Sequence, residues 1–342
     1  TGMLWIPFYR FLGTCQPLEP FDLQQVCFNP KLVADFKDAL VLRGPKDDER
    51  DAFDVAARVQ VGHWPDSYVP DDFWQGLRRL TRYRFKLSRN LSQEKMRFQS
   101  YAFLKCSDWK RVKAFSDVFG ATSAALLTEF TAAELREMTH HQLADLIAHR
   151  GRGRFYDPDA TARAVQRALH TSYPIDFLMD EMVTATLATG WEHIRSIKRL
   201  MKRLDQHISR CIDPVPNPII TVKGLGPVIT AGLLAEIVDI SRFPEHKHLA
   251  QYFGISWTKC FSAGSPTRDS RMTKVGNPYG RYYFVLGADK LRQFNLEYKA
   301  YYRRKYNEVS KHQYKRALVF TARKLVRLVH ALLTKNVPYV RP

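Results

Sequence analysis

Paired cysteines and long apolar runs are both absent from this sequence. Its five cysteines are scattered, odd in number and never spaced as C-x-x-C. This argues against a disulfide framework or a zinc site and indicates a reducing compartment. No run of about 18 apolar residues occurs, so we expect no membrane-spanning helix. We also expect no signal peptide, and we find no internal repeat and no low-complexity tract.

Acidic residues are scarce relative to basic ones. The chain of 342 residues has 53 Lys and Arg against 34 Asp and Glu, which gives a net charge of +19. Such an excess indicates a polyanionic partner, with nucleic acid ahead of a membrane surface, although a soluble protein can also be basic without such a partner. The hydrophobic content of 45% is enough for sizeable cores, and the length predicts two or three domains.

The first 70 residues read as the C-terminal part of an α/β domain. The pattern predicts a short helix over 3–12, a buried strand over 23–28 and a helix over 30–39. A further helix begins near residue 46, with acidic residues in its first turn. These acids suit the positive end of a helix dipole.

Asp48 and Asp51 stand out in this last helix because residues three apart share a helical face. Two carboxylates on one face can share a divalent cation such as Mg²⁺ or Mn²⁺. The alternative is that they only complement the helix dipole and bind no metal.

Residues 71–212 are predicted to form two long basic helices, which begin near Phe73 and Val183. Their apolar seams predict an antiparallel coiled coil, and their basic faces suit either solvent or a nucleic-acid backbone. A helical insertion over about 107–173 separates them and contains the basic loop Gly151–Arg154. The segment DPVPNP, residues 213–218, reads as a linker before a C-terminal domain, 213–342.

The C-terminal domain opens on the turn Gly224-Leu-Gly-Pro227, followed by apolar residues at helical spacing. This pattern is typical of a helix-hairpin-helix, whose free backbone N–H groups can hold a phosphate. An ordinary helical corner with a glycine turn would look the same. Further on, residues 279–304 mix aromatic with basic side chains, which suits base stacking or a helical core equally.

Four further segments carry a resemblance to a known family: DISRFP (239–244), LAQYFG (249–254), FSAGS (261–265) and MTKVGN (272–277). With the glycine turn they closely resemble the C-terminal domain of the insertion-sequence 110 family of transposases, which includes the Piv-type DNA invertases. Departures from the family pattern are modest, such as Phe261 where the family has Gln. The resemblance runs, with gaps, from Thr1 to Tyr339.

The resemblance implies a mainly α protein with an α/β part: an incomplete RuvC-like domain of RNase H type, coiled-coil helices with an insertion, and an α-helical C-terminal domain. The family's RuvC-like domain has four acids in the order Asp, Glu, Asp, Asp. The last two match Asp48 and Asp51, within the segment from Lys46 to Ala52. We expect the Glu just before Thr1 and the first Asp earlier still, so the sequence reads as N-terminally truncated, with half of the metal site outside it.

Ser262 matches the family's serine nucleophile, and Ser265 is the close alternative. A serine hydroxyl that attacks a DNA phosphodiester keeps the bond energy in a phosphoserine link, so that rejoining needs no ATP. A simple turn serine would fit the same loop. We expect nucleic acid to be contacted by a set of glycine-turn and basic residues around this loop: Lys223, Gly224, Gly226, Lys259, Arg268, Arg271, Lys274, Asn277 and Arg281.

The expected function is therefore that of a DNA transposase or site-specific recombinase. The family implies double-stranded DNA and a structured guide RNA as partners, a homo-oligomer (dimer or tetramer), and a cytoplasmic, nucleoid-associated place in a prokaryote; no membrane partner is expected. Two alternatives stay open: a non-catalytic nucleic-acid-binding fragment, and a RuvC-like nuclease that cuts without rejoining.

Overall fold

The structure, a computed structural model, describes residues 5–21, 25–28, 30–40, 47–62, 68–257, 261–262, 265–266 and 272–340. The chain divides into two compact units, residues 1–71 and 72–342. The described helices dominate both units, as the sequence predicts. None of the helices in these ranges is long and apolar enough to cross a membrane.

The first unit consists of short helices. They are α1 (Trp5–Thr14), the 3-10 turn η1 (Gln16–Phe21), α2 (Pro30–Leu40) and α3 (Asp48–Gln60), and α2 packs against α3. The three α-helices were predicted and are confirmed. The strand expected over 23–28 is wrong for residues 25–28, which have no regular structure. A strand needs a neighbour for its N–H and C=O groups, and the described residues of this unit supply none.

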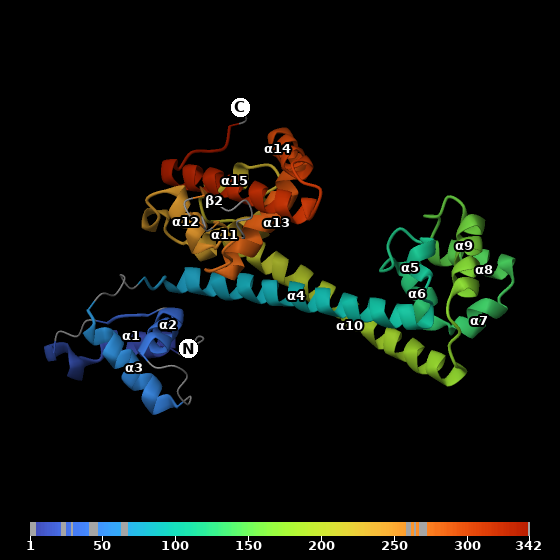
Figure 1. Ribbon diagram of the computed structural model, residues 1–342, viewed down its shortest axis with the longest axis horizontal. Helices are drawn as coiled ribbons and strands as arrows, with labels where there is room; N and C mark the ends of the chain where they lie inside the picture. The colour runs from blue at the N-terminus through green and yellow to red at the C-terminus, as the bar shows by residue number, and fades with distance from the viewer. Residues whose placement is uncertain are drawn as a thin grey trace. The chain divides into compact units, whose positions relative to one another are not determined.

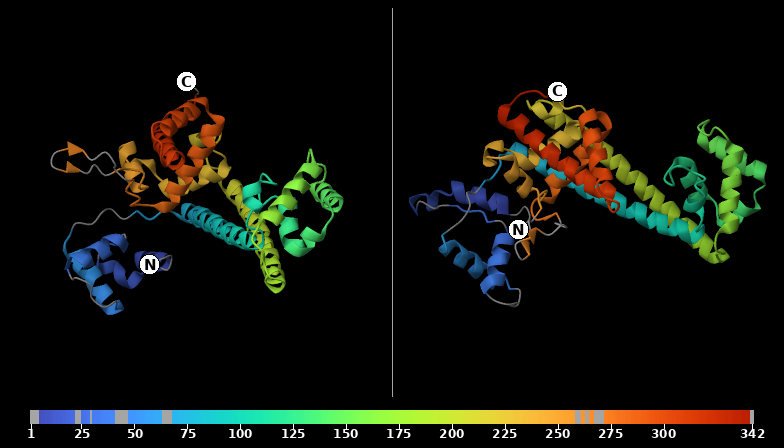
Figure 2. Two further views of the ribbon diagram at one scale, coloured as in Figure 1. Left: turned by 45° about the vertical axis from the view of Figure 1, so that its right-hand side comes forward. Right: turned by 45° about the horizontal axis from the view of Figure 1, so that its top comes forward.

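Two long helices, α4 (Asp72–Lys105) and α10 (Phe177–Ile212), form the axis of the second unit. They run antiparallel, as predicted (Figures 1 and 2). Arg84 Nε donates to Asp205 Oδ1 at 2.5 Å, whereas Lys105 Nζ donates to Thr184 Oγ1 at 2.8 Å. The residue number falls along one helix as it rises along the other, which fixes the direction of the pair.

The insertion between these helices is helical and covers one end of the pair. It comprises α5 (Trp109–Val112), α6 (Ala121–Glu129), α7 (Ala132–Glu137), α8 (His140–Gly151) and α9 (Pro158–Thr171). Capping boxes at Thr131 and Thr139 set the starts of α7 and α8. Its apolar core includes Phe98 of α4 and Leu187 of α10, so the pair and the insertion share one core.

A second core surrounds the opposite end of the pair and includes Leu77 and Ile212. Its elements are the 3-10 turns η2 (Pro218–Thr221) and η3 (Ile240–Arg242), the helices α11 (Pro227–Ile237), α12 (His246–Tyr252), α13 (Pro278–Phe294), α14 (Leu296–Asn307) and α15 (Gln313–Lys335), and the two-residue strands β1 (Phe261–Ser262) and β2 (Ser265–Pro266).

Helix α11 is the centre of this core, because every side chain from Ile229 to Ile237 is buried. It packs on α4, α10 and α13. Several aromatic residues of α13 and α14 are also buried, namely Tyr283, Phe284, Tyr298 and Tyr302. For these four, the interpretation as core is confirmed and a role in base stacking is excluded by their burial.

Candidate functional site

The segment that carries Ser262 is a hairpin held between α12 and α13. The backbone pairs β1 with β2 in antiparallel register, with Ser262 opposite Ser265. Below the hairpin, Trp257 bridges Met272, and the Thr273 N–H donates to the Ser256 carbonyl at 2.9 Å. The two arms are therefore paired at their base. Lys259, Arg268 and Arg271 lie outside the described residues.

The base of the hairpin is fixed to the helices by a few close contacts. Arg281 Nη1 donates to the carbonyls of Phe253 and Lys274, each at 3.0 Å, and so links both arms. Burial lowers the pKa of Arg281 below its usual value. Because this nitrogen is used within the protein, Arg281 acts at least in part as a positioning residue.

Gly276 allows the second arm to approach the first. Its φ of +124° is a conformation that other residues rarely adopt, and a Cβ there would lie 2.4 Å from the Tyr252 carbonyl oxygen. The next residue, Asn277, donates its N–H to that same carbonyl at 2.8 Å. Close passage of the two arms at this point therefore requires glycine.

Asn277 has both of its side-chain polar groups engaged inside the protein. Its Oδ1 accepts from the N–H groups of Tyr279 and Gly280, at 2.9 and 3.3 Å, and caps α13. Its Nδ2 donates to Glu236 Oε2 at 2.6 Å. The structure thus gives Asn277 a positioning role, whereas the sequence placed it among residues that contact nucleic acid.

Glu236 is fully buried and joins α11 to α4 and α13. Arg82 binds it with two hydrogen bonds, Nε to Oε1 at 2.7 Å and Nη2 to Oε2 at 2.8 Å. Arg78 Nε lies 3.7 Å from Oε2 and donates to the Ala235 carbonyl at 2.9 Å. The buried Glu236 carboxylate therefore binds two arginines of α4 and, through Asn277, positions the base of the hairpin.

Helix α15 supports the hairpin from another side. The Trp257 ring stacks on Phe320, with centroids 4.7 Å apart and planes at 11°. Arg316 lies over the Phe320 ring at 4.7 Å and also pairs with Glu308 at 3.0 Å. Arg323 donates to the Ile255 carbonyl at 3.3 Å. Basic side chains of α15 thus brace the arm that leads to Ser262.

The glycine turn precedes α11 as expected, but only a 3-10 turn, η2, precedes the glycines. Lys223 and Gly226 are exposed, and Gly224 has a φ of +108° beside Phe294. The Leu225 N–H donates back to the Val222 carbonyl at 2.9 Å. The turn therefore exposes the Lys223 side chain and the start of α11. The preceding 3-10 turn η2 is shorter than the first helix of a helix-hairpin-helix.

The acidic pair begins α3 in the first unit. Asp47 caps the helix by accepting from the Glu49 N–H at 3.3 Å. Asp48 is exposed, and Asp51 is half-buried with Lys37 Nζ at 2.5 Å. This hydrogen bond raises the pKa of Lys37. The Lys37 ammonium group therefore occupies a position beside Asp51 that a divalent cation could occupy instead.

The donor chemistry of Asp48 and Asp51 fits a hard divalent ion, since both offer carboxylate oxygens. Two carboxylates are fewer than such an ion takes, and no cluster of three or more His, Cys, Asp or Glu with metal-site spacing occurs in the described ranges. A metal ion here would need further oxygen ligands.

Comparison with protein families accounts for this layout. Residues 217–303 match the model of the transposase family IS116/IS110/IS902, and residues 5–104 match that of the DEDD transposases of IS110 elements. The chain belongs to the IS110 transposase family. The first match contains the glycine turn, the hairpin and Asn277, and the second contains Asp48 and Asp51.

A candidate transposase, y4rJ, of Sinorhizobium fredii (strain NBRC 101917 / NGR234) is 34% identical over 83 residues. That alignment covers 24% of this chain and 20% of the relative. The chain thus spans about a fifth of the relative that it matches. Residues 105–216 lie between the two family matches, and they include the whole insertion and the whole of α10.

The buried carboxylate Glu236 was missed by the sequence reasoning. Two signals could have revealed it. Glu236 stands alone in the apolar run GLLAEIV of this IS110-family chain, and α4 carries arginines four apart at 78 and 82. A lone acid in an apolar helix needs a buried partner, and arginine is the residue best able to bind it with two hydrogen bonds.

Proposed function

We propose that this chain is a DNA transposase that cleaves and rejoins DNA strands with the Ser262 hydroxyl as nucleophile. Family membership supports the transposase part. The observation that carries the serine assignment is the anchored hairpin, whose arms are tied by the Trp257–Met272 bridge and by Arg281. A nucleophile has to be held by rigid surroundings to react efficiently.

In the proposed step, the Ser262 oxygen forms a bond to phosphorus while the bond to the DNA 3′ oxygen breaks. The departing oxygen takes up a proton and leaves as a 3′-hydroxyl. Attack of a 3′-hydroxyl on the phosphoserine reverses these changes and returns the serine, so that no external energy source is needed. The basic residues beside the hairpin, Lys274 among the described ones, offset the charge of the phosphate.

Asp48 and Asp51 would hold part of a Mg²⁺ or Mn²⁺ site. When bound, such an ion supplies charge neutralisation at the reacting phosphate and lowers the pKa of a hydroxyl nucleophile. The proposal requires that these carboxylates and Ser262 act on the same phosphate in the assembled protein.

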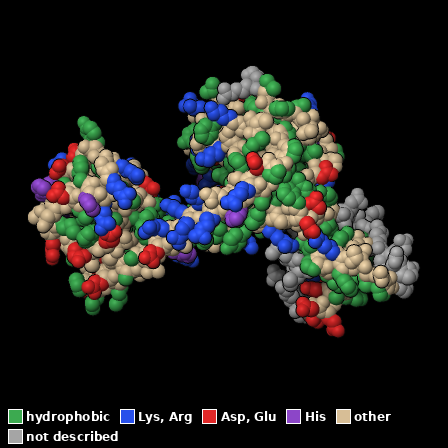
Figure 3. All heavy atoms as spheres, turned by 180° about the vertical axis from the view of Figure 1, so that it is seen from behind, with side chains coloured by type: hydrophobic (Ala, Val, Ile, Leu, Met, Phe, Trp, Pro, Cys, Tyr) green, Lys and Arg blue, Asp and Glu red, His purple; other side chains and the backbone are tan. Residues whose placement is uncertain are grey.

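Double-stranded DNA is the proposed substrate, and the paired helices offer it a basic face. Figure 3 shows Lys and Arg side chains gathered along α4 and α10. The exposed ones are Arg79, Lys86, Arg89 and Arg97 on α4, and Arg195, Lys198, Arg199, Lys202, Arg203 and Arg210 on α10. A guide RNA and a homo-oligomer are carried over from the family as part of the proposal.

The test is a suicide-substrate assay on the full-length protein with Mg²⁺. We expect a covalent protein–DNA adduct that survives denaturation. Ser262→Ala should abolish the adduct while duplex binding persists, and Ser265→Ala, the matched control, should keep it. An adduct that depends on Ser265 instead would refute the assignment to Ser262.

Two other outcomes would replace the proposed function. Cleavage without any adduct would indicate a nuclease that does not rejoin. Duplex binding with neither cleavage nor adduct, with and without Mg²⁺, would indicate a non-catalytic binding protein.

A further inference from the structure

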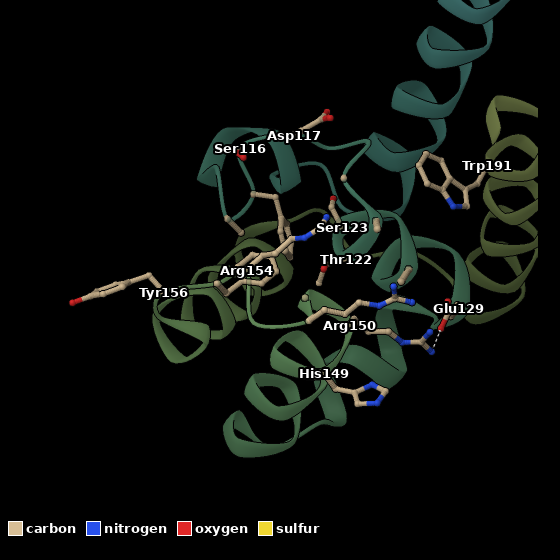
Figure 4. Close-up of a pocket in the computed structure, with 18 of the residues that line it drawn as sticks. Ser116, Asp117, Thr122, Ser123, Glu129, His149, Arg150, Arg154, Tyr156 and Trp191 are labelled. Atoms are coloured by element: carbon tan, nitrogen blue, oxygen red, sulfur yellow. Dashed lines mark hydrogen bonds and ion pairs between the residues drawn. The ribbon is translucent and has the colours of Figure 1, made fainter. Parts of the chain in front are cut away.

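A cleft of about 970 Å³ lies in the helical insertion (Figure 4), which stands at the other end of the α4–α10 pair from the C-terminal core (Figure 1). It is bounded by α6, by the loop that follows α8 and by the facing side of α10. The loop contributes the segment from Gly151 to Tyr156, and α10 contributes Trp191 and Arg195. Most of this region lies outside both family matches.

The loop has a defined shape that presents its basic residues. Arg152 and Gly153 both have positive φ, +50° and +71°. The Arg152 N–H donates to the His149 carbonyl at 3.3 Å, and the Arg154 N–H donates to the Gly151 carbonyl at 3.1 Å. The loop is therefore a tight, internally bonded turn.

An aromatic anchor holds this turn against the insertion. A Cβ on Gly151 would lie 2.3 Å from the Phe155 ring, so glycine is needed for that ring to pack beneath the turn. Phe155 meets the edge of Phe115 at 5.9 Å, and Phe115 stacks on Trp109 at 5.7 Å. Phe155 is half-buried against these rings, whereas its neighbours Arg154 and Tyr156 are exposed.

The cleft has an excess of positive charge. Arg150 is neutralised by an ion pair with Glu129 (Figure 4). Arg152, Arg154 and Arg195 are exposed, and none of them has an ion-pair partner in the described part of the chain. Three unpaired guanidinium groups around one cleft favour a ligand with several phosphates.

The aromatic residues indicate which kind of polyphosphate ligand fits. Tyr156 is fully exposed and points outward from the loop, whereas Trp191 is half-buried on α10. Exposed aromatic rings beside arginines bind nucleic acid by stacking on unpaired bases. A duplex keeps its bases stacked on one another and gives Tyr156 no partner.

We propose that this cleft binds a single-stranded segment of nucleic acid, with Arg152, Arg154 and Arg195 on its phosphates and Tyr156 stacked on a base. This site is separate from the Ser262 hairpin, and the inference does not depend on Ser262 being the nucleophile. RNA and DNA share the recognising chemistry, and the experiment distinguishes them.

The test measures binding of fluorescent oligonucleotides of about 12 nucleotides to the full-length protein by anisotropy, with single-stranded RNA, single-stranded DNA and duplex DNA. The Arg152→Ala/Arg154→Ala variant should bind a single strand on the order of tenfold more weakly. It should also lower the slope of log affinity against log salt by about 1.4, since each lost phosphate contact removes about 0.7 for a single strand.

The matched control is Arg163→Ala/Arg167→Ala, which removes the same charge from exposed positions of α9 that do not line the cleft. Its affinity and slope should stay near the wild-type values. Tyr156→Ala, a change at a fully exposed side chain, should remove photo-crosslinking of a single strand to the 151–156 loop while the melting temperature stays unchanged.

If Arg152→Ala/Arg154→Ala weakens binding of single-stranded RNA, of single-stranded DNA or of both, the result supports binding at the cleft and identifies its ligand. Equal effects of the two double variants would overturn the proposal, as would a loss confined to duplex DNA. This test measures oligonucleotide binding and the Ser262 test measures a covalent adduct, so failure of one can be told apart from failure of the other.

Discussion

The buried carboxylate of Glu236 offers the sharpest test of how this fold holds the hairpin that carries Ser262. Glu236→Gln keeps the shape of the side chain and removes its charge. Arg82 and Arg78 then face each other without an anion between them, although Arg82 keeps its contact over the Tyr279 ring at 4.5 Å. Removing one partner of a buried ion pair costs about 3–5 kcal/mol.

The lower end of that range applies, because the Arg82 side chain is 36% exposed while the Glu236 side chain is fully buried. A loss of about 3 kcal/mol corresponds to a fall in melting temperature of roughly 6–12 °C for a unit of this size. Circular dichroism during thermal unfolding measures it. Since Asn277 Nδ2 also loses its charged acceptor, amide exchange at residues 272–277 should quicken.

Glu245→Gln is the matched control, because Glu245 pairs with Lys247 at the surface, where both side chains are more than half exposed. Surface pairs of this kind contribute about 0–1 kcal/mol. A double-mutant cycle with Arg82→Met should recover part of the loss, since only Arg78 then remains without its carboxylate partner. If Glu236→Gln melted within a degree or two of Glu245→Gln, the proposed role of this network would be refuted.

Three further predictions follow from single contacts. Lys37→Met should tighten Mn²⁺ binding, measured by calorimetry, on the order of tenfold because a competing cation is removed, whereas Lys37→Arg should leave it unchanged. Equal Mn²⁺ affinities of the two variants would argue against a metal at this helix. Gly276→Ala should destabilise the protein by about 1–3 kcal/mol, and Gly226→Ala, with a φ of −70° and no atom near its Cβ, should change stability little; similar melting temperatures would contradict the proposed crossing of the arms. Burial lowers the pKa of Lys105 to about 8, below the value of about 10.4 in an unfolded chain. Between these pH values the unfolded state binds more protons, so the free energy of unfolding of the wild type relative to Lys105→Met should rise from pH 8 to 10 and stay level below pH 7. A constant difference across this range would show that the amine does not titrate there.

Local patterns predicted the helices well. The apolar spacing along α4 and α10 depends only on neighbours three or four residues apart, so their existence and their seams could be read directly. The start of α10 lies at Phe177, earlier than the expected Val183, because Asp176 caps it by accepting from the Leu178 N–H at 3.0 Å. Capping depends on one side chain and is hard to see in a periodic pattern.

The predicted strand over 23–28 shows where local reasoning ends. An apolar run becomes a strand only when another strand pairs with it, and that condition lies outside the run itself. Residues 25–28 have no strand partner among the described residues, and they remain irregular.

In the candidate site too, the sequence identified motif residues but not the contacts that they make. The motif around Ser262 and the acids at 48 and 51 were found by resemblance, and their roles remain predictions. From the sequence, Asn277 was grouped with the residues expected to contact nucleic acid. Its partners are the start of α13, which directly follows it, and Glu236, which lies 41 residues away in the sequence.

By itself, the sequence determined the basic charge, the order of the helices and the antiparallel pair, because charge and apolar spacing are properties of the chain or of near neighbours. Only the tertiary structure decided which polar groups meet: Glu236 with Arg82 and Asn277, Arg281 with both arms of the hairpin, and three unpaired arginines around the cleft of the insertion. Glu236 and Arg82 are 154 residues apart and Glu236 and Asn277 are 41 apart, so these contacts form only when the packing of separate helices brings the groups together.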